Sequence, residues 1–387
     1  MTKPRYSARE MLARLIAFDT TSRLSNLPLI EFVADYLSAH GVDSHLTTDE
    51  ATGKASLFAT IGPAERGGIV LSGHTDVVPV DGQDWSSDPF KLTERDGRLY
   101  GRGTCDMKGF LATALALVPE FQARELNIPL HLALSYDEEV GGIGVRPMIA
   151  RLGGDLPMPK IVIVGEPTSM KIVNCHKGMN SFVTEVTGLE AHSSNPHRGV
   201  NAIVIATELI GELMRIAAEM RERGDPSGRF DPPYTSLNIG TISGGTALNI
   251  IPQSCRFEWE FRNLPGQDCD EIPRRLAAFA ESRLLPEMRA VFPGAAIRTT
   301  RGVGFPDFIP EEGSEAETLV KRLIETNEVR SAAYATEAGL FQQAGAATIL
   351  CGPGDIAQAH QPDEFIDPDQ IERCERFLRR LADYAAG

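Results

Sequence analysis

Acidic and imidazole side chains recur at five places along the chain, in a combination that suits metal-assisted hydrolysis. Each place is a predicted strand end or the loop after one, and in α/β sheets the crevice outside the carboxyl ends of the strands binds ligands. Two histidines and several carboxylates without cysteine suit zinc, cobalt or manganese at catalytic sites with open positions. The residues are His74 and Asp76 in GHTDVVP, Asp106 in YGRGTCDMKG, Glu138 and Glu139 in SYDEEVGG, Glu166 in VGEPT, and His360 in GPGDIAQAHQPDE.

The number of carboxylates favours two metal ions over one. A single catalytic zinc needs three protein ligands, whereas this set could hold two ions about 3.5 Å apart that share a bridging carboxylate. Consecutive Glu138 and Glu139 would point to opposite sides of a strand, but a turn toward Gly141 would let one bind metal and the other act as the base. Asp76 is predicted to accept the N–H of the His74 ring nitrogen that does not bind metal.

Each of these residues also has an ordinary structural interpretation. A histidine at a strand end is commonly a hydrogen-bonded structural residue, and a DEE triplet is commonly a solvated loop. Asp106 could cap the helix that begins near Lys108, and Glu166, which precedes a proline, could be a turn residue. The chain has no GxxxxGK[ST] phosphate loop. The pattern as a whole is therefore far more specific than any one member.

Length and composition describe a globular protein with an acidic surface. At 387 residues the chain is long enough for two domains, and 42% apolar and 24% charged residues are typical of a folded globular protein. A formal net charge of −15 argues against a nucleic-acid surface, because phosphate binding needs clustered lysine and arginine. The charge favours a cationic small substrate, although acidity also serves solubility alone.

The opening sequence and the cysteines predict a cytoplasmic protein. MTKPRYSARE contains no apolar segment, and the longest apolar run, 110–118, is too short to cross a bilayer. Six cysteines are scattered without a CxxC pair. We therefore expect reduced thiols, and neither a disulfide framework nor a thiolate zinc site.

The pattern of helices and strands outside the middle of the chain predicts an α/β sheet with helices on both faces. Ser7 and Glu10 have capping-box spacing at the first helix. Expected helices cover 7–21, a segment after Asn26, 108–126, 313–327 and 368–385, and expected strands cover 54–62, 67–77, 129–139, 159–167 and 346–353.

The middle of the chain has a different pattern. It reads as strand 180–188, helix 200–224, strands 235–245 and 254–264, helix 270–285 and strand 295–303. This β-α-β-β-α-β order is the split pattern of a ferredoxin-like α+β domain. We therefore predict an inserted domain at 178–303, within a catalytic metal-binding domain made of 1–177 and 304–387.

Taken together, the motifs resemble those of the dinuclear zinc exopeptidases, a family that includes succinyl-diaminopimelate desuccinylases, aminoacylases and glutamate carboxypeptidase. The similarity runs from about Ser7 to Leu381 and rests on GHTDVVPV, YGRGTCDMKG, DEEVGG, VGEPT, AHSS and AHQPDEF, in that order. The resemblance implies a mixed sheet flanked by helices and an inserted ferredoxin-like dimerisation domain. A homodimer is therefore expected, without nucleic-acid or membrane partners.

The same resemblance implies a role for each candidate residue. Asp106 would bridge two zinc ions, with His74 and Glu166 on one ion and His360 and Glu139 on the other. Glu138 would be the general base, and Asp76 would orient His74. These assignments leave cobalt or manganese as alternatives to zinc.

The resemblance also places His192, in AHSSNP, at the active site of the partner subunit, where it would stabilise the oxyanion. The alternative is a polar loop residue at the end of a strand. Asn249 in GGTALNIIP and Arg262 in FRNLPG match positions near the substrate carboxylate, which an arginine fork suits. Glu260 and Phe261 depart from the family pattern, which leaves the pose of Arg262 open.

Within the family, the C-terminal motifs YATEAGLFQQAG and ILCGPGDIAQAHQPDEFI resemble those of the branch that deacetylates N2-acetyl-L-ornithine in arginine biosynthesis. Glu337 could pair there with the ornithine ammonium, or could simply be a carboxylate at a helix N-terminus. The expected reaction is hydrolysis of the N-acyl amide of an α-N-acyl amino acid. The alternatives are a desuccinylase, an aminoacylase, a dipeptidase or an inactive amino-acid-binding relative. No GxSxG motif supports a serine hydrolase.

Overall fold

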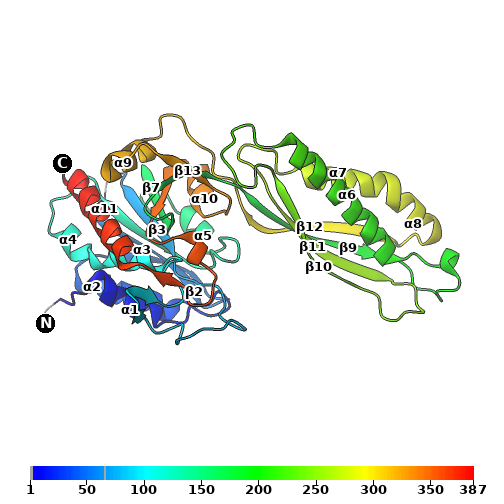
Figure 1. Cartoon of the computed structure of the whole chain (residues 1–387), viewed down its shortest axis with the longest axis horizontal. Coiled ribbons are helices and arrows are strands. Elements are labelled where there is room, and N and C mark those ends of the chain that lie inside the picture. Colours follow the sequence, from blue (N-terminus) through cyan, green and yellow to red (C-terminus); the bar gives the residue numbers. More distant parts are fainter. Residues whose placement is uncertain (1–2, 65–66) are drawn as a thin grey trace. The chain divides into compact units, whose positions relative to one another are not determined.

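The computed structural model describes residues 3–64 and 67–387, and the chain divides into two compact units (Figure 1). Unit 1 comprises Met1–Cys175, Pro310–Arg330 and Thr336–Gly387, and unit 2 comprises His176–Ile309 and Ser331–Ala335. Each unit has its own cluster of buried apolar side chains.

Unit 1 is built on a mixed eight-stranded sheet with the order β1-β2-β6-β3-β7-β14-β8-β13. The central strands β6, β3, β7 and β14 are parallel, whereas β1 and β2 pair antiparallel with their neighbours and β8 pairs antiparallel with β14. The bounds are Ser44–Asp49 (β1), Lys54–Ile61 (β2), Leu130–Ser135 (β6), Ile69–His74 (β3), Ile161–Pro167 (β7), Ala347–Gly352 (β14), Ile172–His176 (β8) and Val329–Ala332 (β13). The predicted mixed sheet flanked by helices is confirmed.

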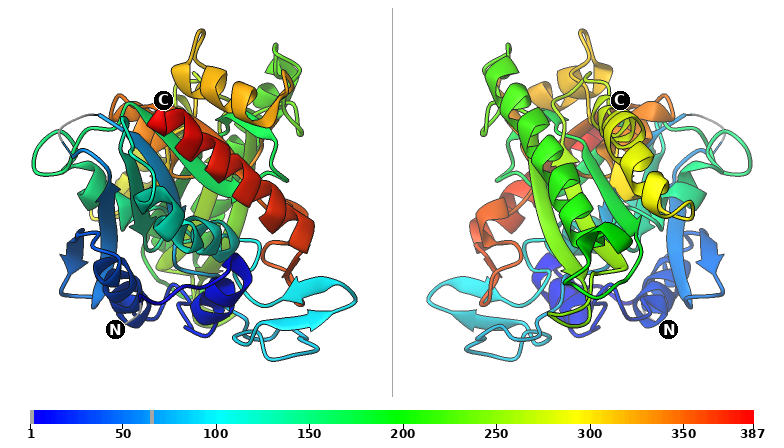
Figure 2. Two further views of the ribbon diagram at one scale, coloured as in Figure 1. Left: turned by 90° about the vertical axis from the view of Figure 1, so that its left-hand side faces the viewer. Right: turned by 90° about the vertical axis from the view of Figure 1, so that its right-hand side faces the viewer.

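Helices cover both faces of this sheet (Figure 2). The main core lies under Ala8–Ile16 (α1), Leu27–Ala39 (α2), Lys108–Ala116 (α3), Val118–Gln122 (α4), Glu315–Ile324 (α9) and Pro368–Ala386 (α11). Val145–Ile149 (α5) and Ala338–Gln343 (α10) pack on the other face. The single helix expected at 108–126 is instead broken at Leu117, where Pro119 in the first turn of α4 lacks an N–H. Within the described ranges, no helix is long and apolar enough to cross a membrane.

A small three-stranded sheet, in the order β15-β5-β4, joins the C-terminal loop to an early segment of unit 1. Its strands are Thr93–Arg95 (β4), Arg98–Tyr100 (β5) and Phe365–Ile366 (β15). Phe365 pairs with Tyr100 and Ile366 with Leu99. This pairing fixes the loop that carries His360 beside the segment that leads to Asp106.

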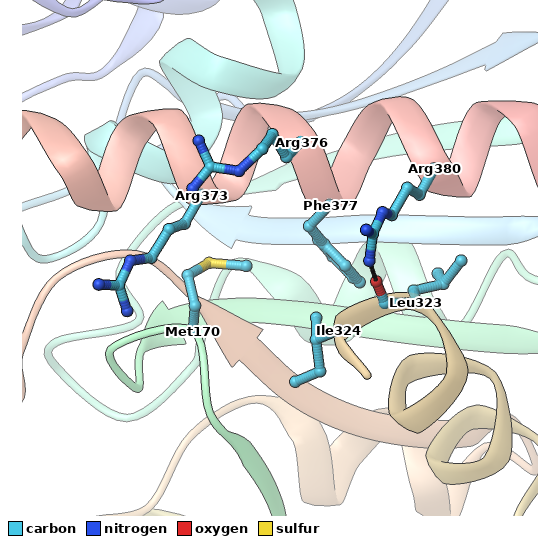
Figure 3. Close-up of a pocket in the computed structure, with 7 residues that line it drawn as sticks. All are labelled: Met170, Leu323, Ile324, Arg373, Arg376, Phe377 and Arg380. Atoms are coloured by element: carbon cyan, nitrogen blue, oxygen red, sulfur yellow. Dashed lines mark hydrogen bonds between the residues drawn. The ribbon is translucent and has the colours of Figure 1, made fainter. Parts of the chain in front are cut away.

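A pocket of about 220 Å³ lies between α9, α11 and the turn before β8 (Figure 3). Its lining is Met170, Leu323, Ile324, Arg373, Arg376, Phe377 and Arg380. Arg380 donates to the carbonyl of Leu323 at 2.8 Å and so caps the end of α9. Each arginine also has a carboxylate neighbour: Asp369 at 3.0 Å from Arg373, Glu372 at 3.8 Å from Arg376 and Glu325 at 3.2 Å from Arg380. The three arginine charges of this pocket are thus matched by three carboxylates, and none of the candidate metal ligands lines it.

Unit 2 has the predicted β-α-β-β-α-β element order. It contains Met179–Thr187 (β9), Ala202–Arg223 (α6), Ser236–Gly244 (β10), Ser254–Arg262 (β11), Glu271–Phe279 (α7), the short π-helix Ala280–Leu284, Leu285–Val291 (α8) and Ala296–Phe305 (β12). The sheet order is β10-β11-β9-β12, with antiparallel neighbours. The helices lie on one face of this sheet (Figure 1). Beneath them, Trp259 stacks on Phe182 with 4.3 Å between ring centroids.

Candidate metal centre

The candidate residues of unit 1 converge at the carboxyl edge of its parallel strands. His74 is the last residue of β3, and Glu166 is the next-to-last residue of β7. Glu138 and Glu139 lie in the turn after β6, and His360 lies in the loop after β14. Parallel strands that end at one edge bring their following loops together, as expected for a ligand site in such a sheet.

The carboxylate of Asp106 lies between the two histidines. Its Oδ1 is 3.0 Å from Nε2 of His74, and its Oδ2 is 3.4 Å from Nε2 of His360. The same nitrogen of His360 is 3.1 Å from Oε2 of Glu139. One carboxylate therefore presents a different oxygen to each imidazole, which is the arrangement that a bridging ligand requires.

Among the described residues, potential ligand atoms fall into two overlapping groups, in each of which all atoms lie within 4.8 Å of one another. One group is His74, Asp106 and Glu139, and the other is His74, Glu138 and Glu166. All six predicted metal and base residues therefore lie close together once His360 is added through Glu139. The geometry places Glu138 among the potential ligands, so its role as the base stays a prediction.

The position of Asp76 corrects one expectation. Nδ1 of His74 donates to the main-chain carbonyl of Asp76 at 2.9 Å, whereas the Asp76 carboxylate is 3.6 Å from that nitrogen. The carboxylate instead accepts the N–H groups of Glu138 at 3.1 Å and Glu139 at 3.2 Å, and the hydroxyl of Ser22 at 2.8 Å. The main-chain carbonyl of Asp76, rather than its carboxylate, makes the predicted hydrogen bond to the His74 ring, and the role of Asp76 in orienting His74 stays a prediction. The Asp76 carboxylate shapes the DEE turn.

A buried ion pair holds the start of the same turn. Nζ of Lys54 lies 2.6 and 2.7 Å from the two carboxylate oxygens of Asp137, and both side chains are less than one tenth exposed. Asp137 has a φ of 54°, in the left-handed region that aspartate tolerates better than most residues. Gly142 closes the turn by donating to the Asp137 carbonyl at 3.0 Å.

The electrostatics of the three glutamates favour a bound cation. Burial raises the pKa of Glu138, Glu139 and Glu166, and the charge of a neighbouring carboxylate raises each further: Glu166 acts on Glu138, and Asp106 acts on the other two. A divalent cation would stabilise the ionised forms against both effects. The mixed nitrogen and oxygen donors match catalytic zinc, cobalt or manganese, so the residues present fit a metal centre.

The pKa values of the two histidines and of Asp106 are shifted toward the charged forms, whereas those of the three glutamates are shifted toward the neutral form. Burial is the largest single influence on His74 and opposes its protonation, but the hydrogen bond with Asp106 and the charges of the neighbouring carboxylates together outweigh burial and hold the His74 pKa well above its usual value. The hydrogen bond with Asp106 raises the pKa of His360 to about 10. Burial opposes ionisation of Asp106, and hydrogen bonds with His360 and His74 lower its pKa despite this. A metal ion would compete with protons for these imidazole nitrogens.

Glu337 is buried rather than exposed to a pocket. It directly precedes α10 and has no exposed surface. Its two carboxylate oxygens accept hydroxyl hydrogen bonds from Ser72 on β3 and, at 2.9 Å, from Ser135 on β6. Burial raises the pKa of this carboxyl group. The position matches the structural alternative, and pairing with a substrate ammonium stays a prediction.

The other predicted residues lie in unit 2. His192 and Asn249 are exposed, and their loops meet where Ser193 donates to the carbonyl of Asn249 at 3.0 Å. Nδ1 of His192 lies 2.8 Å from the hydroxyl of Ser194. Arg262 ends β11, with its guanidinium 3.3 Å from the carboxylate of Glu260. The substrate and oxyanion roles of these three residues stay predictions.

Two buried residues near the centre, Arg102 and Glu364, received no role from the sequence. Both are 1% exposed, and their side chains form an ion pair of 2.8 Å. Each stands four residues from a predicted ligand, Arg102 before Asp106 and Glu364 after His360. The sequence signal that could have identified them is an arginine in the motif of Asp106 and an oppositely charged glutamate in the motif of His360.

Comparisons with known proteins agree on one family. Residues 70–384 match the model of peptidase family M20/M25/M40. An acetylornithine deacetylase of Pasteurella multocida is 36% identical over 379 residues, with 96% of each chain covered. Aminopeptidase PepT of Bacillus cereus has a TM-score of 0.75 at 19% identity, with 98% of each chain covered. The YXEP protein of Bacillus subtilis, titled a dinuclear metal-binding peptidase from the M20 family, has a TM-score of 0.65 at 15% identity, covering 97% of this chain and 98% of that one.

Proposed function

The chain belongs to peptidase family M20/M25/M40 and is a metal-dependent hydrolase; from this premise we propose that it hydrolyses N2-acetyl-L-ornithine to L-ornithine and acetate. The reaction class is hydrolysis of the N-acyl amide of an α-N-acyl amino acid. The observation that carries the proposal is the Asp106 carboxylate, which faces His74 with one oxygen and His360 with the other. The choice of substrate is supported by the deacetylase relative, which is similar over nearly the full chain.

The proposed centre holds two zinc ions, and the same donors would accept cobalt or manganese. His74 and Glu166 would bind one ion, His360 and Glu139 the other, and Asp106 both. When bound, the ions supply Lewis-acid activation of a water molecule and of the acyl carbonyl.

Glu138 is proposed as the general base and then the general acid. Its carboxylate takes a proton from the attacking water as the new C–O bond forms, and it gives that proton to the amine nitrogen as the C–N bond breaks. The pKa of this buried carboxyl is raised by burial, which is the direction that lets it hold the transferred proton. Asp76 holds Glu138 in place through the main chain, so its contribution is to positioning.

Residues of unit 2 are proposed to complete the site. His192 from a second subunit would donate a hydrogen bond to the tetrahedral oxyanion, and its exposed position leaves it available. Asn249 and Arg262 would bind the substrate carboxylate, for which a guanidinium fork is well shaped. For Glu337, complete burial between two serine hydroxyls favours the structural role over contact with the ornithine ammonium.

We further propose a homodimer formed through the inserted domain at 178–303, within a catalytic domain of 1–177 and 304–387. A cytoplasmic protein of arginine biosynthesis would fit the six cysteines, all of which are free thiols. These assignments rest on the family resemblance of the sequence.

Steady-state kinetics on two substrates test the proposed reaction. The zinc-loaded protein should hydrolyse N2-acetyl-L-ornithine with a higher kcat/KM than N-succinyl-diaminopimelate, and a chelator should abolish both activities until zinc is restored. Hydrolysis of the succinyl substrate alone would change the proposed substrate but not the proposed type of reaction. Failure of the metal-loaded protein to hydrolyse any N-acyl amino acid would refute the catalytic proposal.

A further inference from the structure

The carboxylate of Glu364 accepts four hydrogen bonds, three of them from the turn that ends at Asp106. Its Oε2 accepts from the guanidinium of Arg102 at 2.8 Å and from the N–H of Gly103 at 3.0 Å. Its Oε1 accepts from the N–H groups of Cys105 at 2.8 Å and Asp106 at 3.1 Å. One side chain, distant in sequence, thereby fixes the main chain that carries Asp106.

The guanidinium of Arg102 extends the same network to His360. It donates to the carbonyl of Gln361 at 3.2 Å and to the side-chain oxygen of Gln83. The side-chain amide of Gln83 in turn donates to the carbonyl of His360 at 2.9 Å. Arg102 therefore contacts the main chain at Gln361 directly and at His360 through Gln83, while Glu364 balances its charge.

The two proposed metal positions differ in what holds their ligands. His74 and Glu166 belong to the buried strands β3 and β7, and the ring of His74 is oriented by a carbonyl of its own segment. His360 lies in a loop with a φ of 63°, and its side chain is 52% exposed. The position of His360 therefore depends more on hydrogen bonds from outside the sheet than the position of His74 does.

The energetic cost of this ion pair argues for a specific role. Arg102 and Glu364 are each 1% exposed, and the desolvation of a buried ion pair commonly offsets its attraction. Apolar residues could fill the same space, but they could not accept the N–H groups of Gly103, Cys105 and Asp106, which would then be buried without partners. The pair is therefore suited to fixing the main-chain conformation of the turn from Gly103 to Asp106.

We propose that the Arg102–Glu364 pair positions Asp106 and His360 relative to each other and so sets the affinity of the metal position formed by His360, Glu139 and Asp106. The position formed by His74, Glu166 and the shared Asp106 depends on it less, because strands β3 and β7 hold two of its ligands. This inference rests on the proposed two-metal centre. Arg102 and Glu364 are positioning residues, because they act through Asp106 and His360.

The test is metal binding to a Glu364→Gln variant. Metal-free protein is titrated with Co²⁺ and followed by visible absorption, and the two dissociation constants are refined by competition with a chelator. We expect one of the two binding steps to weaken about 10- to 100-fold, the range for residues that orient metal ligands, and the other, which shares Asp106, to weaken less. The metal-free variant should unfold at a lower temperature than the wild type, because Arg102 loses its buried partner, but it should remain folded at the temperature of the titration.

Two further variants make the result specific. Asp363→Asn removes the neighbouring carboxylate, which accepts from the N–H and hydroxyl of Ser86 and has no hydrogen bond to the Gly103–Asp106 turn, so both steps should be unchanged. Gln83→Leu removes the link to the His360 carbonyl at a half-buried position. It should weaken the same step as Glu364→Gln, and it carries the test if Glu364→Gln fails to fold.

The outcomes separate this inference from the proposed function. A wild-type protein that binds one ion would refute the two-metal centre, whatever the variants do. A wild type that binds two ions, with both steps unchanged in Glu364→Gln and Gln83→Leu, would overturn the positioning role. Equal weakening of both steps in Glu364→Gln and in Gln83→Leu would also overturn it, because the pair would then not act preferentially on the position that includes His360.

Discussion

Oδ2 of Asp106 lies 3.4 Å from Nε2 of His360, and this oxygen is not the one that faces His74. Because the two carboxylate oxygens serve two imidazoles, the two proposed metal positions share a single side chain. A change at this residue should therefore affect both positions together, in contrast to a change at either histidine.

Asp106→Asn should remove both ions. The amide keeps the size of the side chain but loses the negative charge and one acceptor oxygen, so metal affinity should fall by more than the roughly 10- to 100-fold seen for residues that merely orient ligands. Elemental analysis after dialysis checks this. Retention of one ion per chain would mean that Asp106 is a ligand of one position only.

Glu138→Gln and Glu139→Gln should behave differently although the residues are adjacent. Loss of the general base should lower kcat by about 10² to 10⁴ with both ions retained, whereas loss of a ligand should lower metal content. Kinetics and elemental analysis on the same preparations decide between them. Metal loss in Glu138→Gln would show that Glu138 is a ligand, as its proximity to His74 and Glu166 allows.

Mixed dimers test the proposed contribution of His192 to a partner's site. Glu138→Gln and His192→Asn subunits should each be nearly inactive alone. After they are unfolded and refolded together, half of the dimers should be mixed, and each mixed dimer should have one complete site, so activity should return to about a quarter of the wild-type value. If the mixture stays inactive while exchange of subunits is verified by mass spectrometry, His192 does not act in a partner's site.

Lys54→Met should destabilise unit 1 through the DEE turn. Removing the lysine leaves the buried Asp137 carboxylate without its partner, which typically costs about 3 to 5 kcal/mol. The double variant Lys54→Met/Asp137→Asn should recover part of that loss, because no charge is then left unpaired. Urea unfolding of the metal-free proteins measures both values. A double variant as unstable as Lys54→Met would show that the ion pair is not the cause.

His131 should make stability depend on pH. Burial lowers its pKa from 6.5 to about 4, so below pH 6.5 the unfolded chain takes up a proton that the folded chain refuses. The contribution of His131 to the free energy of unfolding is therefore fully present above about pH 6.5. It decreases as the pH falls toward 4, by up to about 3 kcal/mol.

The variant His131→Asn should show a smaller decrease in unfolding temperature between pH 6.5 and 4 than the wild type. His45→Asn, at an exposed position on β1, is the matched control and should keep the wild-type decrease. Parallel pH profiles for His131→Asn and the wild type would exclude His131 as the source.

The sequence was sufficient to predict that the candidate ligands gather at one edge of the sheet. His74 and Glu166 end apolar runs that read as buried strands, and the rule that ligands bind beyond the carboxyl ends of parallel strands brings their neighbours to the same place. The break before Pro119 was also foreseeable, because proline disfavours the interior of a helix.

Contacts that depend on backbone conformation or on distant segments were beyond the reach of the sequence. The Asp76 carboxylate reaches the DEE turn because Asp137 adopts a positive φ, which short-range patterns do not encode. Glu364 meets Arg102 across 262 positions of sequence, and Glu337 meets Ser72 across 265. Such pairs follow from strand order and loop paths, which no local motif specifies.

The discontinuity of unit 1 has a consequence for biosynthesis. Unit 2 is nearly continuous in sequence, so its core can close while residues 310–387 are still being translated. The parallel strand β14 and the loop bearing His360 leave the ribosome only afterwards. A nascent chain thus carries Asp106, Glu138, Glu139 and Glu166 before His360 is made, so the proposed metal position that includes His360 could be filled only after the C-terminal loop has been translated.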